Sequence, residues 1–179
     1  MTKYIYAFDE GQRTMKDLLG GKGANLSEMK RLGLPVPDGF TITTEACIEY
    51  LRQHAQLPTE VKTQLVDHLA AFTKRTGKAF SSDTNLLLVS VRSGAKISMP
   101  GMMDTILNLG LNDDNVETLA SKTGDVRFAY DCYRRLLQMF GEVVYNIPMV
   151  AFDTYFEDYK QRHGFENDAA ISADGLKDI

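Results

Sequence analysis

The chain has 179 residues, of which 44% are hydrophobic and 25% charged, an ordinary composition for a globular protein. Its net charge of −4 argues against a general nucleic-acid-binding protein, which would carry a basic stripe. A phosphate ligand would therefore have to be met by a few local cations. The N-terminus has no signal-peptide pattern, and no stretch approaches the ~20 apolar residues of a membrane span. We expect no membrane contact and a cytoplasmic location.

The cysteines and histidines predict no metal or redox site. Cys47 and Cys132 stand far apart and match no ligand or redox spacing, so we expect reduced thiols. The three histidines lie in polar, helix-like contexts without neighbouring ligands.

Up to Gly110, the hydrophobic pattern mixes strands with helices. Short apolar or β-branched runs predict strands at 3–8, 40–43 and 86–91. Apolar residues at helical spacing predict helices at 24–33, 43–54 and 61–77, with Thr43 or Thr44 capping the second. This mixture indicates an α/β or α+β unit.

After Gly110 the pattern becomes helical, with helices predicted at 116–121, 128–145 and 148–162 and no strand beyond residue 111. The prediction is an α+β fold with a mixed α/β lobe at 1–111 and a helical subdomain at 112–179. The acidic tail, 165–179, is expected to end without a closing element, as if the chain were cut there.

The first candidate ligand site is the sequence GGKG, in which Gly20, Gly21 and Gly23 surround Lys22. Glycines allow the backbone to approach an anion, and a following helix offers N–H groups and a positive dipole end. The spacing does not fit a Walker A loop. A plain glycine turn with an exposed lysine is the alternative.

Arg92 is the second candidate, because it ends the apolar run LLLVSV. Ligands gather at strand ends in α/β sheets, and a guanidinium can grip phosphate with two hydrogen bonds. The alternative is a structural salt bridge at a sheet edge.

The loop that follows carries Gly94, Gly101 and three methionines before Asp104. Its glycines could let N–H groups line a phosphate, and Met102 and Met103 could cover a base or ribose. The methionines could equally pack into a core. Asp104 could touch a metal or cap a helix-like segment at 105–110.

Arg134 and Arg135 lie on the polar side of the predicted helix 128–145. Such a pair is usually a solvated helix face. The residue pattern does not favour one arginine over the other.

Three stretches together carry a resemblance. They are LLGGKGANLSEMKRLGLPVPDGFTITTEAC, LLVSVRSGAKISMPGMMDTILNLGLND and TGDVRFAYDCYRRLLQMFGEVV, and they closely resemble the N-terminal nucleotide-binding region of the pyruvate, phosphate dikinase family. SVRSGA followed by SMPGMMDTILNLG is the most specific part. The related phosphoenolpyruvate synthases and glucan-type dikinases share SVRS but diverge in the Met-rich loop.

The resemblance implies an enzyme, a phosphotransferase that binds its nucleotide in an ATP-grasp fold, of which this chain holds the first lobe. In that family a histidine on a separate domain takes a pyrophosphoryl group from ATP, and AMP leaves. Phosphate then removes the terminal group as pyrophosphate. The phosphohistidine finally converts pyruvate to phosphoenolpyruvate at a distant barrel domain.

The resemblance also implies roles for individual residues. Lys22 and Arg92 would bind the ATP phosphates, the loop around Gly101 and Met103 would cover the nucleotide, and Arg135 would meet the attacking or terminal phosphate. Arg92 and Arg135 are thus the expected catalytic residues. Mg²⁺ is the expected second cofactor beside ATP, with its ligands in a second lobe outside this chain.

The implied partners are ATP, phosphate and the rest of the same polypeptide, in a full-length homodimer. The segment alone is expected to be inactive. Two alternatives stay open: a standalone, non-catalytic nucleotide-binding or interaction module, and a piece of a sister enzyme such as phosphoenolpyruvate synthase.

Overall fold

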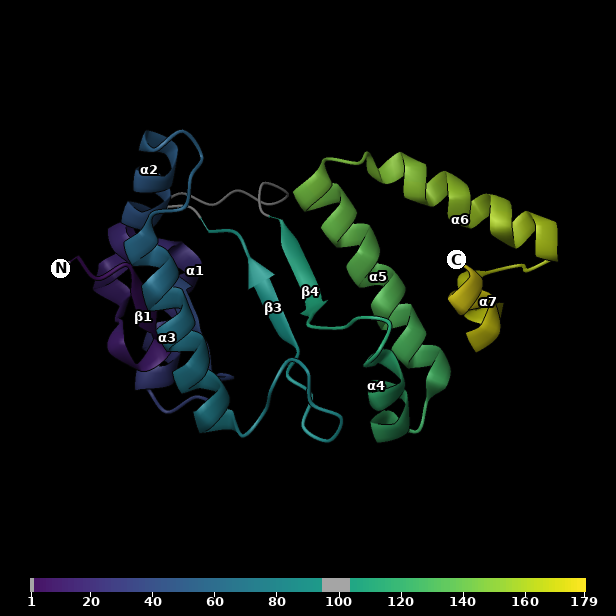
Figure 1. Ribbon diagram of the computed structural model, residues 1–179, viewed down its shortest axis with the longest axis horizontal. Helices are drawn as coiled ribbons and strands as arrows, with labels where there is room; N and C mark the ends of the chain where they lie inside the picture. The colour runs from purple at the N-terminus through teal and green to yellow at the C-terminus, as the bar shows by residue number, and fades with distance from the viewer. Residues whose placement is uncertain (1, 95–103) are drawn as a thin grey trace. The chain divides into compact units, whose positions relative to one another are not determined.

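The computed structural model describes residues 2–94 and 104–179 (Figure 1). The strands in this part of the chain are β1 (Ile5–Ala7), β2 (Phe40–Ile42), β3 (Val89–Arg92) and β4 (Thr105–Leu109). The helices are α1 (Lys16–Arg31), α2 (Thr44–Arg52), α3 (Thr59–Thr76), α4 (Val116–Thr123), α5 (Val126–Tyr145), α6 (Met149–His163) and α7 (Ala173–Asp178). Short 3₁₀ helices occupy Phe8–Glu10, Arg13–Met15 and Asp168–Ala170. The predicted α+β class is confirmed.

The described residues form two compact units, the first containing 2–77 with 93–94 and the second containing 78–92 with 104–179. Compactness therefore groups β3 and β4 with the helices that follow them. The expected lobes, 1–111 and 112–179, instead follow the change of element type, and residues 112–179 contain helices without a strand. Which division corresponds to the domains of the full-length protein stays a prediction.

In the first unit, β1 and β2 pair antiparallel with Ile5 opposite Ile42. The helix α3 packs against β1, and α1 packs against β2. Ile5 and Val61 of α3 are fully buried, and Phe72 of α3 meets the ring of Phe40 edge-on at 6.4 Å. The apolar stripe of α3 that its sequence spacing predicts thus supplies part of the core of this unit.

The helix α1 begins earlier than the sequence pattern predicts. It starts at Lys16 rather than near Ala24, and it is broken at Gly20, where φ is 68° and ψ is 170°. Glycine adopts this conformation at no steric cost. The break divides α1 into a short first segment and a second segment that begins at Gly21.

In the second unit, β3 and β4 form an antiparallel hairpin with Arg92 opposite Thr105. The expectation of a helix-like segment at 105–110 is therefore wrong. Ile106 is buried whereas Leu107 is exposed, which is the alternation of a half-buried strand. A bulge or similar irregularity interrupts the pairing between Val89 and Val91.

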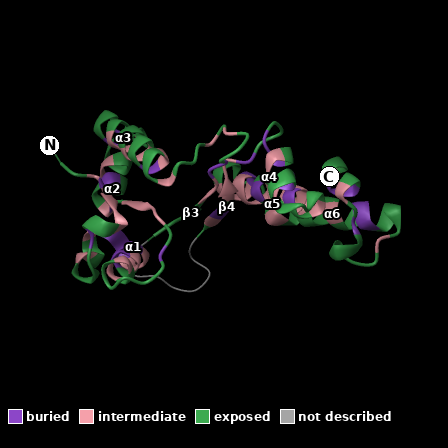
Figure 2. Ribbon diagram, turned by 90° about the horizontal axis from the view of Figure 1, so that it is seen from below, coloured by how far each residue is buried: buried purple, intermediate pink, exposed green. Residues whose placement is uncertain are grey.

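The buried face of the hairpin meets α5. Leu86 and Ile106 form a core cluster with Leu111 and with Leu136 of α5, and Figure 2 shows buried residues where β4, α4 and α5 meet. The helix α5 begins after Asp125, whose carboxylate accepts a hydrogen bond from the N–H of Phe128 at 2.8 Å. This cap stabilises the start of the helix by satisfying one of its free N–H groups.

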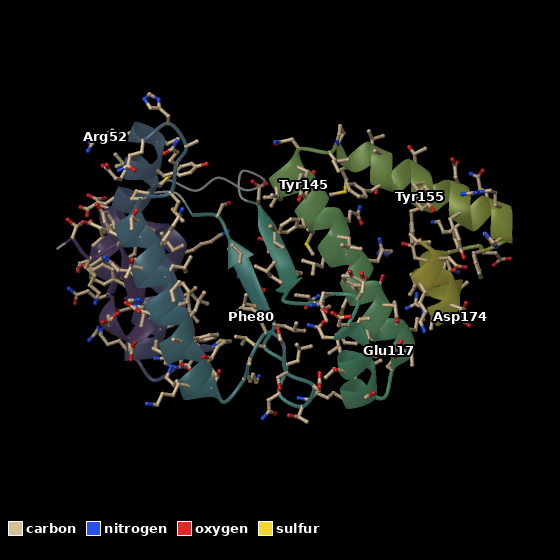
Figure 3. All side chains as sticks on the ribbon, viewed as in Figure 1. Arg52, Phe80, Glu117, Tyr145, Tyr155 and Asp174 are labelled. Carbon is tan, nitrogen blue, oxygen red and sulfur yellow. The ribbon has the colours of Figure 1, made fainter. Side chains whose placement is uncertain are left out.

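Asn115, which is buried just before α4, ties the ends of the hairpin together. Its side-chain amide donates to the carbonyl of Gly110 at 2.7 Å and to that of Phe80 at 3.2 Å. Its side-chain oxygen accepts from the N–H of Asn112 at 2.9 Å. Figure 3 shows Phe80 near the start of β3. One side chain thus fixes the segment before β3 and the residue after β4.

The tail is folded, contrary to the expectation that no element closes it. Ile171 and Leu176 are buried together with Tyr159 of α6, and α7 packs against α5. The guanidinium of Arg127 on α5 donates to the carbonyls of Asp168 and Ile171 at 2.6 and 2.8 Å. The tail has too few apolar residues at regular spacing to predict a helix by periodicity.

Candidate functional site

The GGKG sequence lies at the break in α1. A helical segment that begins at Gly21 has first-turn N–H groups and a positive dipole end, both of which favour an anion. Lys22 is half-buried in this first turn, and no residue in the described ranges forms an ion pair with it. GGKG therefore lies at a break in a helix, with Lys22 half-buried, and its binding of an anion stays a prediction.

Gly23 has a packing role that the sequence pattern does not indicate. A Cβ at this position would lie 2.8 Å from both Cγ2 and Oγ1 of Thr41 on β2. Such a distance is too short for a real contact, so a larger side chain would push α1 away from the sheet. Close packing accounts for this glycine without a ligand.

Arg92 ends β3 and is exposed. No carboxylate in the part of the chain that the structure describes pairs with it. The alternative of a structural salt bridge thus lacks a partner among these residues. An exposed guanidinium at the end of a strand can take a phosphate in two-point contact.

Most of the loop after Arg92 lies outside the described residues. Gly101 and Met103, which the resemblance predicts to cover the nucleotide, lie outside the described residues, as does Met102. Asp104 directly precedes β4, so it is not the cap of a helix at this position.

The two arginines of α5 differ in their surroundings. Arg134 has a side chain only 16% exposed, which lies over the ring of Phe156 at 4.4 Å and donates to Gln138. Arg135 is 62% exposed and pairs through Nε with Asp131 at 2.9 Å. Arg134 therefore joins α5 to α6, whereas Arg135 remains accessible to a ligand.

Two titratable groups on the same helix are unsuited to proton transfer near neutral pH. Burial, with a smaller contribution from Asp131, raises the pKa of the Cys132 thiol. Burial and a hydrogen bond to Asp113 raise the pKa of Tyr133 to about 12. What this helix offers a ligand is positive charge, a property suited to phosphate chemistry.

The candidate cations are distributed over both units. Lys22 belongs to the first unit, while Arg92 and Arg135 belong to the second. In the second unit, α5 packs on β4, which pairs with the strand that carries Arg92. Within the described ranges, no three carboxylate, histidine or cysteine side chains come close enough to hold a metal ion.

Comparison with protein families shows which family the chain matches. Residues 16–55 and 53–172 match the family described as pyruvate phosphate dikinase, AMP/ATP-binding domain. The chain belongs to this family. Lys22, Arg92 and Arg135 all lie inside the matched ranges of the pyruvate phosphate dikinase domain.

Curated relatives agree with the family match. The chain is 50% identical to pyruvate, phosphate dikinase of Clostridium symbiosum over 179 residues, which is 100% of the chain and 20% of the relative. It is 49% identical to that of Rhizobium meliloti (strain 1021), over 97% of the chain and 20% of the relative. With pyruvate, phosphate dikinase 1, chloroplastic, of Zea mays the identity is 50%, over 95% of the chain and 18% of the relative. The chain thus spans about a fifth of these relatives.

Asp131, a site residue that sequence reasoning missed, contacts both arginines of α5. The sequence feature that could have indicated Asp131 is the spacing Asp-x-x-Arg-Arg, in which the two cations fall at i+3 and i+4 on a helix. Both of these positions face the carboxylate, so the residue belongs to the candidate site.

Among the helices in the described ranges, none is both long and apolar enough to cross a bilayer.

Proposed function

We propose that this chain is the N-terminal nucleotide-binding part of a pyruvate, phosphate dikinase, the first lobe of an ATP-grasp domain with a helical subdomain. The observation that carries the proposal is the family match over residues 16–55 and 53–172, to a domain described as binding AMP or ATP. The full-length protein would convert ATP, phosphate and pyruvate to AMP, pyrophosphate and phosphoenolpyruvate. The segment alone is expected to be inactive.

The reaction proceeds by three transfers in this proposal. A histidine of another domain attacks the β-phosphorus of ATP, and the bond to the α-phosphate oxygen breaks to release AMP. Phosphate then attacks the terminal phosphorus, the bond from that phosphorus to the bridging oxygen breaks, and pyrophosphate is formed while the β-phosphoryl group stays on the histidine. The remaining phosphoryl group passes from the histidine to the enolate oxygen of pyruvate.

The residues of this chain serve the first two transfers. Lys22 and Arg92 hold the phosphates of ATP, and Arg135 meets the attacking or terminal phosphate. Phosphoryl transfer needs little covalent help from the protein, because positioning and neutralisation of spreading negative charge supply most of the rate. An exposed cation without an ion-pair partner in the described ranges, such as Arg92, suits this task.

Mg²⁺ belongs to the proposal, with its ligands in the second lobe of the full-length protein, as the resemblance implies. Bound there, it would neutralise charge on the ATP phosphates. The resemblance extends the proposal to a cytoplasmic homodimer, although the relative from Zea mays is named as chloroplastic.

Product stoichiometry in the full-length protein tests the proposal. Incubation with ATP, phosphate and pyruvate should give AMP, pyrophosphate and phosphoenolpyruvate in equal amounts, and omission of phosphate should stop turnover. If the protein turns over without added phosphate and releases phosphate instead of pyrophosphate, it is a phosphoenolpyruvate synthase. A protein that binds ATP but forms no AMP would be a non-catalytic module, and the proposal would be wrong.

A further inference from the structure

Asp131 lies between the two arginines of α5 and uses a different oxygen for each. Oδ1 accepts from Arg134, from Nη2 at 2.9 Å and from Nε at 3.3 Å. Oδ2 lies 2.9 Å from Nε of Arg135. The side chain of Asp131 is only 19% exposed, so its position is well defined by its surroundings.

The inner side of this group is fixed by packing. Arg134 stacks on Phe156 of α6, and its Nη1 donates to Gln138 at 3.0 Å. These contacts hold the guanidinium that in turn holds Oδ1 of Asp131. The carboxylate is thereby anchored to the junction of two helices rather than to one flexible side chain.

The outer side is arranged to leave a phosphate-binding edge open. Arg135 pairs with Asp131 through Nε, and its terminal nitrogens make no other ion pair within the described ranges. An arginine restrained by an ion pair at Nε loses side-chain freedom while both terminal nitrogens can still donate to an anion. A guanidinium ordered in advance loses less entropy when a ligand binds.

We propose that Asp131 is a positioning residue for the phosphate-binding arginine Arg135. The inference rests on the proposed function, because it assumes that Arg135 contacts the attacking or terminal phosphate. The two claims can be tested separately, since Asp131 would position Arg135 without touching the ligand.

Asp131→Asn should have two opposite effects on the KM for phosphate, one from the lost charge and one from the lost positioning of Arg135. Removing a carboxylate near an anion site raises the local positive potential, which by itself lowers the KM for phosphate. Losing the anchor of Arg135 raises that KM instead. We expect the loss of the anchor to dominate and to give a net rise of about two- to fivefold, which corresponds to about 0.4–1 kcal/mol.

The experiment measures the KM for phosphate and for ATP in the full-length protein. Glu142→Gln is the matched control, because it removes one carboxylate from α5 about 16 Å further along the helix. We expect Asp131→Asn to raise the phosphate KM and Glu142→Gln to leave it unchanged. An unchanged or lowered phosphate KM in Asp131→Asn would overturn the inference.

A double-mutant cycle separates this inference from the proposed function. Arg135→Ala should raise the phosphate KM, and adding Asp131→Asn to it should not raise the KM further, because the anchoring effect of Asp131 needs Arg135. If Arg135→Ala leaves the phosphate KM unchanged, the role proposed for Arg135 is wrong and the inference falls with it. If both single variants act but their effects multiply in the double variant, Asp131 acts independently and only the inference is wrong.

A structural role for Asp131 would give a different result. Loss of its bond to Arg134 lowers the melting temperature, but a general loss of stability would not move the phosphate KM alone. Should Asp131→Asn be too unstable to assay, Asp131→Glu provides the second variant, since it keeps the charge and displaces the acceptor. If the phosphate KM of Asp131→Glu is higher than that of Glu142→Gln, the inference is supported. If the two values are equal, the inference is wrong.

Discussion

The two candidate phosphate-binding regions differ in how much of their sequence is explained by packing. At the break in α1, the conformation of Gly20 and the contact of Gly23 with Thr41 account for two of the three glycines. At the end of β3, no side chain in the described ranges pairs with the exposed Arg92. Packing thus explains most of the glycines in the first region, whereas no ion pair in the described ranges explains the charge of Arg92 in the second.

The difference separates two kinds of inference. A glycine needed for close packing says little about a ligand, so Lys22 alone carries the functional prediction in the first unit. An exposed cation without a partner in the described ranges is better support for binding, because its charge has no structural use there. Substitution of Gly23 should therefore affect stability, whereas substitution of Arg92 should affect function.

The largest expected effect belongs to Arg92→Ala in the full-length protein. The loss of a charge-assisted contact to developing phosphoryl charge should slow the ATP half-reaction by ~10²–10³, or about 3–4 kcal/mol. Exchange between pyruvate and phosphoenolpyruvate uses another site and should be spared. Isotope exchange in each half-reaction measures the two rates separately.

Stability and a conservative variant provide the controls for Arg92. The melting temperature should barely change, because substitutions at exposed sites usually stay within about 0.5 kcal/mol. Arg92→Lys should recover only part of the rate, since lysine keeps the charge but not the planar fork. Equal loss in both half-reactions, with a lower melting temperature, would show that Arg92 is structural.

Asn115→Ala should have the largest effect on stability, because Asn115 holds the hairpin that carries Arg92. The substitution leaves the carbonyls of Phe80 and Gly110 without the side-chain donor that now reaches them. Loss of these bonds should lower the free energy of unfolding by about 2–3 kcal/mol. Urea denaturation of the chain measures this change.

Asn112→Ala is the matched control for Asn115. Asn112 is exposed, and its side chain accepts hydrogen bonds from the neighbouring backbone N–H groups of Asp114 and Asn115. Asn112→Ala should lower the free energy of unfolding by less than half as much as Asn115→Ala. If the two variants are equally destabilised, the bonds to Phe80 and Gly110 do not hold the hairpin.

Gly23→Ala tests whether packing explains the first region. Alanine is intrinsically better than glycine in a helix by about 1 kcal/mol, but its Cβ would lie 2.8 Å from two atoms of Thr41. Overpacking costs about 1–3 kcal/mol, so we expect a net loss of up to about 2 kcal/mol. Thermal unfolding of the chain measures it.

The compensating change is Thr41→Ala, which removes both atoms that would clash. In that background Gly23→Ala should be neutral or stabilising. If Gly23→Ala instead stabilises the parent chain by about 1 kcal/mol, the gain expected from helix propensity alone, packing does not explain this glycine and ligand approach is the better account.

Sequence patterns predict the long helices of this chain better than its small sheets. The helices α3 and α5 show apolar spacing over several turns, so their types and approximate ranges follow directly. The ends of α6 follow from Pro148 and Gly164, which start and stop a helix. The segment 105–109 resembles a helix in sequence, because its five residues are too few to separate the two periods. Its strand conformation depends on pairing with β3, which is a tertiary contact.

The tail and the arginine pair show the same limit. The burial of Ile171 depends on Tyr159, and the path of the tail depends on the carbonyl contacts of Arg127, neither of which is local. Arg134 and Arg135 are equivalent in the sequence pattern, and the position of Phe156 distinguishes them. Their charge can be predicted from sequence, but their burial cannot.

The smallest expected effect concerns Asp38, which joins two helices of the first unit by charge and so supports the helix that carries GGKG. Its carboxylate lies 2.9 Å from Nζ of Lys30 on α1 and 3.5 Å from Nε of Arg75 on α3. The hydrogen bond from Lys30, together with the charge of Arg75, lowers the pKa of Asp38. Since all three side chains are about a third or more exposed, Asp38→Asn should cost less than about 1 kcal/mol at pH 7.

The pH dependence shows whether this contribution comes from charge. Because the pKa of Asp38 is lower in the folded state, the stabilisation is complete above the unfolded value, near ~3.9, and is lost as the pH falls through the folded value. Melting curves from neutral to strongly acidic pH should therefore show the difference between Asp38→Asn and the parent chain disappearing at the acidic end. The control Asp67→Asn, at an exposed position of α3, should show no difference at any pH. A difference that persists in acid would mean that Asp38 stabilises the fold by shape and hydrogen bonding rather than by charge.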